Sequence, residues 1–296
     1  MRAATYPFGL YTWFGYVRTF EEKMRLIGAA GFDTICTWWD DTFAELDGTR
    51  QEQVAMAAAH GLRIEHAHIP YLGSDKLWAS GAAGDELVAE HMRSVALAAE
   101  CGVSTLVIHP YETEKSDTDD PRWYHRRMRE LGAVCRDCDV RLAIENLDGV
   151  HRLAQLVDPL VDENEHVGVC FDSGHANVSD PGDFWMLDHY GERVFALHLH
   201  DNDTTRDKHL VPFTPGCNLP WDAFMAALRK CGFAGSLMLE SCAPFDFDAY
   251  DNVEGAGEVL DPDEPIETYL ARSYEACARI AAACQGGVRG QVSDIA

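Results

Sequence analysis

The sequence predicts a single (β/α)8 barrel, and three observations lead to that prediction. The chain has 296 residues, which suits one such barrel, since the fold typically needs about 250 residues. Short runs rich in β-branched residues alternate with longer amphipathic stretches along the whole chain. The connections between them are mostly short. Such an alternation closes naturally into a barrel, because its crossovers are right-handed and closure hides both sheet edges.

The expected strands are apolar runs, and the expected helices begin and end at ordinary boundary residues. Thr19 can cap the first helix, and Gly31 follows its end. The strands are expected at 8–12, 34–37, 63–68, 105–109, 140–145, 166–172, 194–200 and 236–240. The helices are expected at 19–30, 51–60, 85–101, 121–138, 151–157, 183–189, 221–231 and 266–283.

The alternative fold is an open doubly wound sheet, but no GxGxxG motif opens a helix after the first strand. The alternation continues to the last expected helix with no linker and no internal repeat. We therefore expect residues 1–285 to form one barrel domain and residues 286–296 to form a frayed C-terminal tail.

Composition excludes several classes of protein. The net charge is −25, from 49 acidic and 24 basic residues, and this balance repels a nucleic-acid backbone. No apolar stretch approaches the roughly 20 residues of a membrane span, and the start of the chain lacks the apolar region of a signal peptide. The ten cysteines are scattered, as expected of free thiols in a reducing compartment. We expect a soluble, cytoplasmic protein without membrane or nucleic-acid partners.

Histidines and carboxylates recur where the expected strands end. Glu145, Asp172, His200 and Glu240 close four consecutive strands, five to eight. In a parallel barrel, these strand ends meet at one mouth. Three carboxylates and one imidazole suit a divalent ion such as Mn, Mg, Co or Zn, and without a cation the carboxylates would repel one another. The sequence therefore predicts a metal site with these four ligands.

Further imidazoles and an aspartate are expected beside this site: His68, His109, His175, Asp207 and His209. Imidazole-rich sets favour zinc, but histidines at a barrel mouth can also bind substrate hydroxyls, which is the interpretation we prefer here. Strand alternation places His198 and His200 on the same face, so their spacing cannot decide which is the ligand. We favour His200 because it lies nearer the mouth.

In these segments the sequence resembles the xylose-isomerase-like (β/α)8 superfamily of sugar isomerases, sugar 3-epimerases and endonuclease IV. The resemblance spans nearly the whole chain and is specific for the superfamily rather than for one substrate. It is carried by His68-Ile69-Pro70-Tyr71-Leu72, Val107-Ile108-His109-Pro110, Ala143-Ile144-Glu145-Asn146, Phe171-Asp172-Ser173-Gly174-His175, His198-Leu199-His200-Asp201-Asn202, Asp207-Lys208-His209-Leu210 and Met238-Leu239-Glu240.

The resemblance implies an isomerase or epimerase of a ketose, sugar derivative or sugar phosphate. In the similar epimerases one ion is held by the residues matching Glu145, Asp172, His200 and Glu240, and the two glutamates exchange a proton through a metal-bound enediolate. His175 and Arg206 match positions that bind substrate oxygens. The loop at 215–221 departs from the usual Gly-x-Gly of these families, so its geometry is not carried over.

Other functions stay open at this point. An endonuclease IV-like zinc phosphodiesterase would use three zinc ions, with His68, His109, Glu145, Asp172, His175, His200, Asp207, His209 and Glu240 as candidate ligands. The net charge argues against a DNA substrate. A metal-dependent dehydratase or lyase of a keto-sugar would need the same base and ion. A third class is a binding or structural protein whose barrel has lost its enzymatic activity. Such a protein would be metal-free, and Mn or Zn would not change its thermal stability.

Aromatic residues at the expected ends of the first two strands suggest a substrate wall. Trp13, Phe14, Trp38 and Trp39 could form an apolar wall for a sugar ring, or they could equally pack beneath the helices. Exposed mouth aromatics and the acidic loop at 245–263 could also serve a subunit contact, so a homo-oligomer is expected as an alternative to a monomer.

Overall fold

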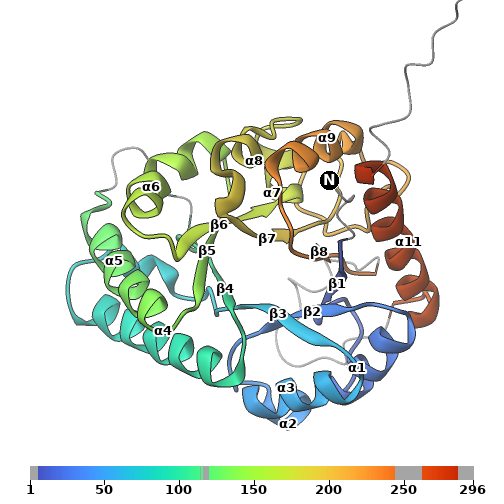
Figure 1. The fold of residues 1–296 in the computed structure, drawn as a ribbon, viewed down its shortest axis with the longest axis horizontal. Helices are drawn as coiled ribbons and strands as arrows, with labels where there is room; N and C mark the ends of the chain where they lie inside the picture. Colours follow the sequence, from blue (N-terminus) through green and yellow to red (C-terminus); the bar gives the residue numbers. More distant parts are fainter. Residues whose placement is uncertain (1–5, 114, 116–119, 244–261, 286–296) are drawn as a thin grey trace, which may run out of the picture.

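The eight parallel strands form one barrel, and the helices surround it (Figure 1). The structure is a computed structural model that describes residues 6–113, 115, 120–243 and 262–285. It confirms the predicted (β/α)8 fold. The strands are β1 Phe8–Tyr11, β2 Thr34–Trp38, β3 Arg63–His68, β4 Thr105–Ile108, β5 Arg141–Glu145, β6 Val167–Asp172, β7 Val194–His198 and β8 Leu237–Leu239.

From β1 to β7, consecutive strands pair in parallel, and β1 pairs in parallel with β8. The barrel closes between β7 and β8 through a single parallel bridge, Leu199 to Leu239. Two backbone hydrogen bonds support this bridge: Leu199 N donates to Met238 O at 2.9 Å, and Glu240 N donates to Leu199 O at 3.1 Å. The closure therefore lies next to the strand ends from which the expected metal ligands come.

The helices agree with the expected order, and they differ in four short elements that were not expected and in α6, which is longer than expected. The helical elements are α1 Phe20–Ala29, α2 Ala44–Asp47, α3 Arg50–Ala59, η1 Ser74–Leu77, α4 Ala82–Cys101, α5 Arg122–Asp137, α6 Val150–Glu163, α7 Ser173–Ser179, α8 Trp185–Tyr190, η2 Gly191–Arg193, α9 Trp221–Cys231 and α11 Ile266–Gln285. Thr19 caps α1 through its side chain, as expected. Four short elements were not predicted: α2, η1, α7 and η2. Each has seven residues or fewer, too short for a clear 3.6-residue period.

Strand alternation divides the core into two layers. Outward-facing residues such as Leu10, Ile35 and Leu142 pack with the helices in the main hydrophobic cluster. Smaller clusters come mainly from the alternate strand positions: Val107, Ala143, Cys170 and Ala196, with the adjacent Phe195, in one, and Tyr11, Cys36 and Met238 in the other. The barrel interior below the mouth is thus packed with side chains, as in other barrels of this type.

All ten cysteines are free thiols. Across the described part of the chain, no helix combines the length and apolar character needed to cross a bilayer. The expected C-terminal tail, 286–296, lies outside the described residues, as does the acidic loop at 245–263 apart from its last two residues.

Candidate metal centre

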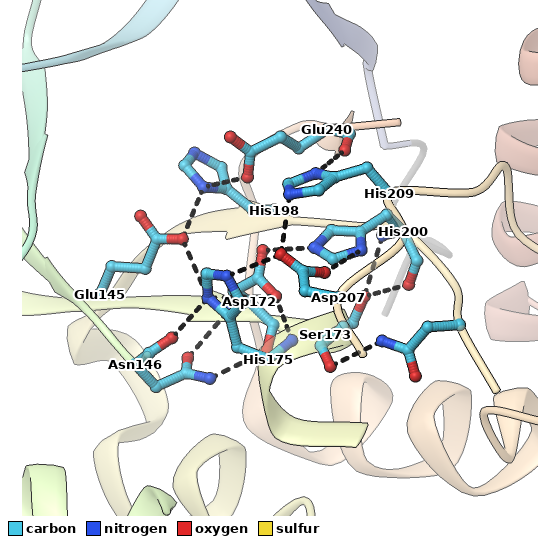
Figure 2. A network of polar contacts seen from close by, with 12 residues as sticks. Glu145, Asn146, Asp172, Ser173, His175, His198, His200, Asp207, His209 and Glu240 are labelled. Carbon is cyan, nitrogen blue, oxygen red and sulfur yellow. Dashed lines mark hydrogen bonds and ion pairs between the residues drawn. The ribbon is translucent and has the colours of Figure 1, made fainter. Parts of the chain in front are cut away.

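Four side chains from consecutive strand ends converge at the mouth of the barrel (Figure 2). Glu145, Asp172 and His198 are the last residues of β5, β6 and β7, and Glu240 follows β8. One ligand atom from each lies within 4.8 Å of the others, and we call this set the core group. The first three are buried, and the Glu240 side chain is only 11% exposed. The structure thus brings together three of the four predicted core ligands.

The histidine of the core group is His198, not His200. His198 Nδ1 lies 3.2 Å from Glu145 Oε1 and 2.8 Å from Glu240 Oε2. β7 ends at His198, and the chain then turns away, since Asp201 forms an antiparallel bridge with Leu210. The expected alternation therefore does not extend to the second histidine of the motif, and His198 takes the place among the core carboxylates that was expected for His200.

His200 belongs instead to a second set of side chains, the outer group of His175, His200, Asp207 and His209. Its Nε2 atom lies 3.0 Å from Asp172 Oδ2, and its ring stacks on His209 with 4.1 Å between centroids. Asp207 Oδ2 lies 2.8 Å from His209 Nε2 and 3.2 Å from His175 Nε2. The outer group therefore adjoins the core group at Asp172.

A third set, the rim group, consists of His68, His109 and Glu145. The Nε2 atoms of His68 and His109 lie 3.2 Å and 3.4 Å from Glu145 Oε2. Glu145 belongs to both the rim group and the core group, so its two oxygens face different neighbours. The predicted ring of imidazoles beside the core is thus present, and it divides into two groups on either side of it.

Three of these imidazoles are oriented by backbone carbonyls. The Nδ1 atom of His68 lies 2.7 Å from Ile69 O, that of His175 lies 2.8 Å from Asn146 O, and that of His209 lies 2.8 Å from Glu240 O. A carbonyl only accepts, so each Nδ1 carries a proton, and Nε2 is the nitrogen that faces the carboxylates and is left to bind a cation. This arrangement is typical of histidines that bind metal.

The turn after β6 holds the outer group in place. The Asp172 carboxylate caps α7 by accepting a 2.7 Å hydrogen bond from His175 N. Asn146 joins β5 to β6, since its side chain donates to Asp172 O and accepts from Asp172 N. Ser173 Oγ donates to His200 O at 2.8 Å and accepts from His200 N at 3.0 Å. The Asp172-Ser173-Gly174-His175 motif thus positions both the carboxylate and the neighbouring imidazoles.

Glu145, Glu240 and Asp207 are held in their ionised form by neighbouring imidazoles. Burial raises the pKa of Glu145, but the imidazoles of His198 and His109 outweigh burial and hold the pKa well below its ordinary value. Burial acts in the same direction on Glu240, and His198 lowers its pKa to about 2. Asp207 is also held well below its ordinary pKa by the histidines of its own group, against burial.

The donor set fits a divalent cation. Within the described chain, Asp207 Oδ1 and His200 Nδ1 are buried and face each other at 3.4 Å without hydrogen-bond alignment, and Glu240 Oε2 lies beside His198 Nδ1 in the same way. Buried carboxylates concentrated in this way need positive charge beyond neutral imidazoles. The core group offers three carboxylates and one imidazole, whereas the outer and rim groups are richer in imidazole and suit zinc.

The other predicted site residues lie around this centre with different exposure. Trp13 is 45% exposed, and its ring meets His209 edge to face. Trp38 is half-buried and stacks on His68 with 5.7 Å between centroids. Arg206 is exposed in the loop before Asp207. Phe14 and Trp39, by contrast, are fully buried in the main core, so they do not form a substrate wall.

Sequence reasoning missed His66. This residue is buried on β3, and its Nε2 atom lies 3.2 Å from Nε2 of His198. The sequence could have indicated it, because His66 stands two residues before His68 and alternate residues of a strand share one face. Tyr71 was also missed as a ring neighbour: it stacks on His109 with 4.7 Å between centroids.

Comparisons with curated proteins give partial matches. The chain is 30% identical over 155 residues to an uncharacterized protein of Sinorhizobium fredii, covering 49% of each chain. It is 29% identical over 122 residues to a D-psicose 3-epimerase of Enterocloster bolteae, covering 39% of this chain and 38% of the epimerase. The chain therefore spans about half or less of the length of these relatives.

Solved structures share the fold over nearly the whole chain. A D-psicose 3-epimerase with D-tagatose, from Clostridium cellulolyticum H10, has a TM-score of 0.74 at 15% identity, covering 94% of this chain and 99% of that one. An L-ribulose 3-epimerase has a TM-score of 0.71 at 15% identity, covering 94% of each chain. A 3-keto-D-glucoside 4-epimerase from E. coli has a TM-score of 0.67 at 16% identity, covering 94% of this chain and 99% of that one.

The sequence profile of one family matches most of the described barrel. The match covers residues 24–283, from the first helix to the last, and so includes every residue of the core, outer and rim groups. This chain belongs to the xylose isomerase-like TIM barrel family.

Proposed function

We propose that this protein is a divalent-metal-dependent isomerase or epimerase of a ketose, sugar derivative or sugar phosphate, with Glu145 and Glu240 as its acid/base pair. The observation that carries the proposal is the convergence of both glutamates on one imidazole atom, Nδ1 of His198, at the barrel mouth. The named activities of several relatives, all sugar epimerases, support the same chemistry.

The two carboxylates suit a two-base reaction. Each is ionised, so either can take a proton from the carbon next to the carbonyl group of the substrate and leave an enediolate. If the other glutamate first takes a proton from solvent and then delivers it to the opposite face of that carbon, the configuration inverts, and the first glutamate releases its proton to solvent to restore the starting state. If the proton returns to the neighbouring carbon, the carbonyl group moves and the reaction is an isomerisation.

The core group would hold the ion: Glu145, Asp172, His198 and Glu240. When bound, a divalent cation acts as a Lewis acid that makes the carbon-bound proton more acidic. Carboxylates with low pKa values are weak bases, so they depend on this acidification. The proposal leaves Mn, Mg, Co and Zn as the candidate ions. Around the site, His68, His109, His175 and Arg206 are proposed to contact substrate oxygens, and Trp13 and Trp38 to flank the sugar.

The test combines metal analysis with activity on a panel of ketoses, including D-psicose, D-tagatose and D-fructose, and their phosphates, in deuterium oxide. We expect deuterium at the reacting carbon of one substrate class. We expect Glu145→Gln and Glu240→Gln each to lower turnover by at least about 100-fold. Glu165→Gln, on the exposed surface, is the control. Full activity in either glutamine variant with metal still bound would contradict the two-base mechanism.

A second candidate, an endonuclease IV-like zinc phosphodiesterase, is favoured by one observation. The core, outer and rim groups lie side by side, joined through Asp172 and Glu145, and together could hold more than one ion. The net charge of −25 opposes it, because a DNA backbone would be repelled. Incubation with abasic-site DNA after zinc loading separates the two candidates, and we expect no cleavage.

A dehydratase or lyase of a keto-sugar would begin with the same proton abstraction. It would then expel a hydroxyl group from the next carbon instead of returning the proton to carbon. The products distinguish these reactions: an epimer or isomer keeps the mass of the substrate, whereas a dehydration product loses one water.

A further inference from the structure

We propose that His66 is a positioning residue for the metal centre: it accepts the Nε2 proton of His198 and thereby fixes the tautomer in which His198 Nδ1 can bind a cation. This inference rests on the proposed metal site, and it adds a residue that belongs to none of the core, outer and rim groups. The two Nε2 atoms face each other at 3.2 Å, and both rings are buried.

The two nitrogens of His198 have different neighbours. Nδ1 points to the carboxylates of Glu145 and Glu240 at 3.2 Å and 2.8 Å, so this atom is the ligand atom. A neutral imidazole carries one proton. If Nδ1 offers its lone pair to a cation, the proton must be on Nε2, and a buried N–H needs an acceptor. His66 Nε2 is placed to be that acceptor.

His198 differs in this respect from three other imidazoles of the centre. His68, His175 and His209 present Nε2, and each has a backbone carbonyl at Nδ1. His198 instead presents Nδ1 to the carboxylates, and its Nε2 atom faces Nε2 of His66 on β3. A side chain from a neighbouring strand therefore takes the role that carbonyl groups take elsewhere in the site.

Strand geometry explains how His66 reaches this position. It lies two residues before His68 on β3, and it pairs in register with Cys36 of β2, just after the register shift that follows Ile35. From the far side of the barrel, β7 brings in His198 opposite Asp172 of β6. The rings of His66 and His198 lie 5.3 Å apart at 30°.

The remaining neighbours of His198 are poorer acceptors. The thiol of Cys36 is close enough to form one ligand cluster with both histidines, and the thiol of Cys170 forms another with His198 and Glu145. Sulfur accepts hydrogen bonds weakly. Tyr11 and His68 lie face to face with the His198 ring, at 6.5 Å and 5.8 Å between centroids, and so bury it without offering an acceptor at its edge.

The experiment compares Mn²⁺ affinity, measured by competition with a chelating dye, in the wild type and three variants. His66→Leu removes the acceptor, and His66→Gln keeps an oxygen acceptor near the same place. Cys36→Ala perturbs the same buried cluster without removing an imidazole. The melting temperature of each metal-free variant is measured alongside, so that a folding defect is recognised separately.

We expect His66→Leu to weaken Mn²⁺ binding by about 10–100-fold, the usual effect of losing such a partner. His66→Gln should recover most of this loss, and Cys36→Ala should bind as the wild type does. Equal affinity in His66→Leu and the wild type would overturn the proposal, as would a glutamine variant as weak as the leucine variant. If the wild type binds no divalent ion at all, the result contradicts the proposed metal site on which the role of His66 depends.

Histidine ¹⁵N spectra of the zinc-loaded protein give a readout that simple packing would not change. The expected state has the proton of His198 on Nε2 and the proton of His66 on Nδ1. Zinc-loaded protein with the His198 proton on Nδ1 would overturn the proposal.

Discussion

Gly174 leaves room for the imidazole of His200. A Cβ atom at this position would overlap the Cε1 and Nδ1 atoms of that ring, which is itself fully buried. We expect Gly174→Ala to lower the free energy of unfolding by about 2 kcal/mol, the usual cost of overpacking, although alanine is the better helix former. Urea unfolding measures this change.

Gly149→Ala is the matched control, because its added Cβ would meet only Asp180 Oδ2, at 3.3 Å. We expect that variant to stay within about 1 kcal/mol of the wild type. Equal stability of the two variants would show that His200 can move aside without cost.

His91 makes the protein sensitive to acid at a site remote from the proposed chemistry. It is buried on α4, its Nε2 atom has no hydrogen-bond partner among the described residues, and burial lowers its pKa from 6.5 to about 4. The unfolded chain therefore binds more protons between these pH values, so stability falls as the pH drops from about 6.5 to 4. The loss at pH 4 amounts to at most about 3 kcal/mol.

The measurement is the free energy of unfolding of metal-free protein at several pH values between 4 and 7. We expect His91→Leu to have a shallower slope than the wild type over this range. Parallel slopes would mean that His91 is protonated in the folded state as easily as in the unfolded state.

Residue-level rules identified most of the proposed ligands. Polar residues that end apolar runs predicted Glu145, Asp172 and Glu240 correctly as neighbours. The rule could not choose between His198 and His200, because residues two apart on a strand point to the same face. The choice depends on where β7 stops pairing, and that is set by bridges to β8 and to residue 210, which local sequence does not encode.

The loop between η1 and α4 is held by a buried arginine on a different helix. Arg127 of α5 donates to the carbonyl oxygens of Leu77 and Gly81 at 2.8 Å and 3.0 Å, and it pairs with Asp85 at 3.0 Å. Removing it leaves several carbonyl groups without a donor. We expect Arg127→Met to lower the free energy of unfolding by about 3 kcal/mol.

Arg126 provides the control, since it pairs with the same Asp85 but its side chain is 43% exposed. We expect Arg126→Met to change stability by less than about 1 kcal/mol in the same urea unfolding experiment. Similar losses in the two variants would show that the ion pair, and not the buried carbonyl contacts, is what matters.

At the level of elements, the eight main helices and eight strands could be read from periodicity and boundary residues. α6 runs from Val150 to Glu163, well beyond the expected 151–157, despite Pro159 in its interior. Its apolar residues at helical spacing pack against the core, and this packing outweighs the cost of the proline. The short elements at the mouth depend on contacts between loops, which the sequence pattern does not contain.

For the molecule as a whole, the acidic centre should couple stability to metal. A ligand that binds only the folded state stabilises it by about 2.7 kcal/mol at a hundredfold excess over its dissociation constant. We therefore expect Mn²⁺ or Zn²⁺ to raise the melting temperature by several degrees and EDTA to reverse the change. Sodium chloride of equal ionic strength is the control, and an unchanged melting temperature would favour a metal-free binding protein.

The most direct test of the central claim is the Mn²⁺ dissociation constant of His198→Ala compared with that of His200→Ala. His198 belongs to the core group, so His198→Ala should weaken Mn²⁺ binding by more than about 100-fold. Loss of a residue that only supports the ligands usually weakens metal binding by about 10–100-fold. The loss of His200, which lies outside the core group and contacts it at Asp172, should weaken binding less than about tenfold. Strong binding in His198→Ala, or a larger loss in His200→Ala, would contradict the assignment of the metal centre.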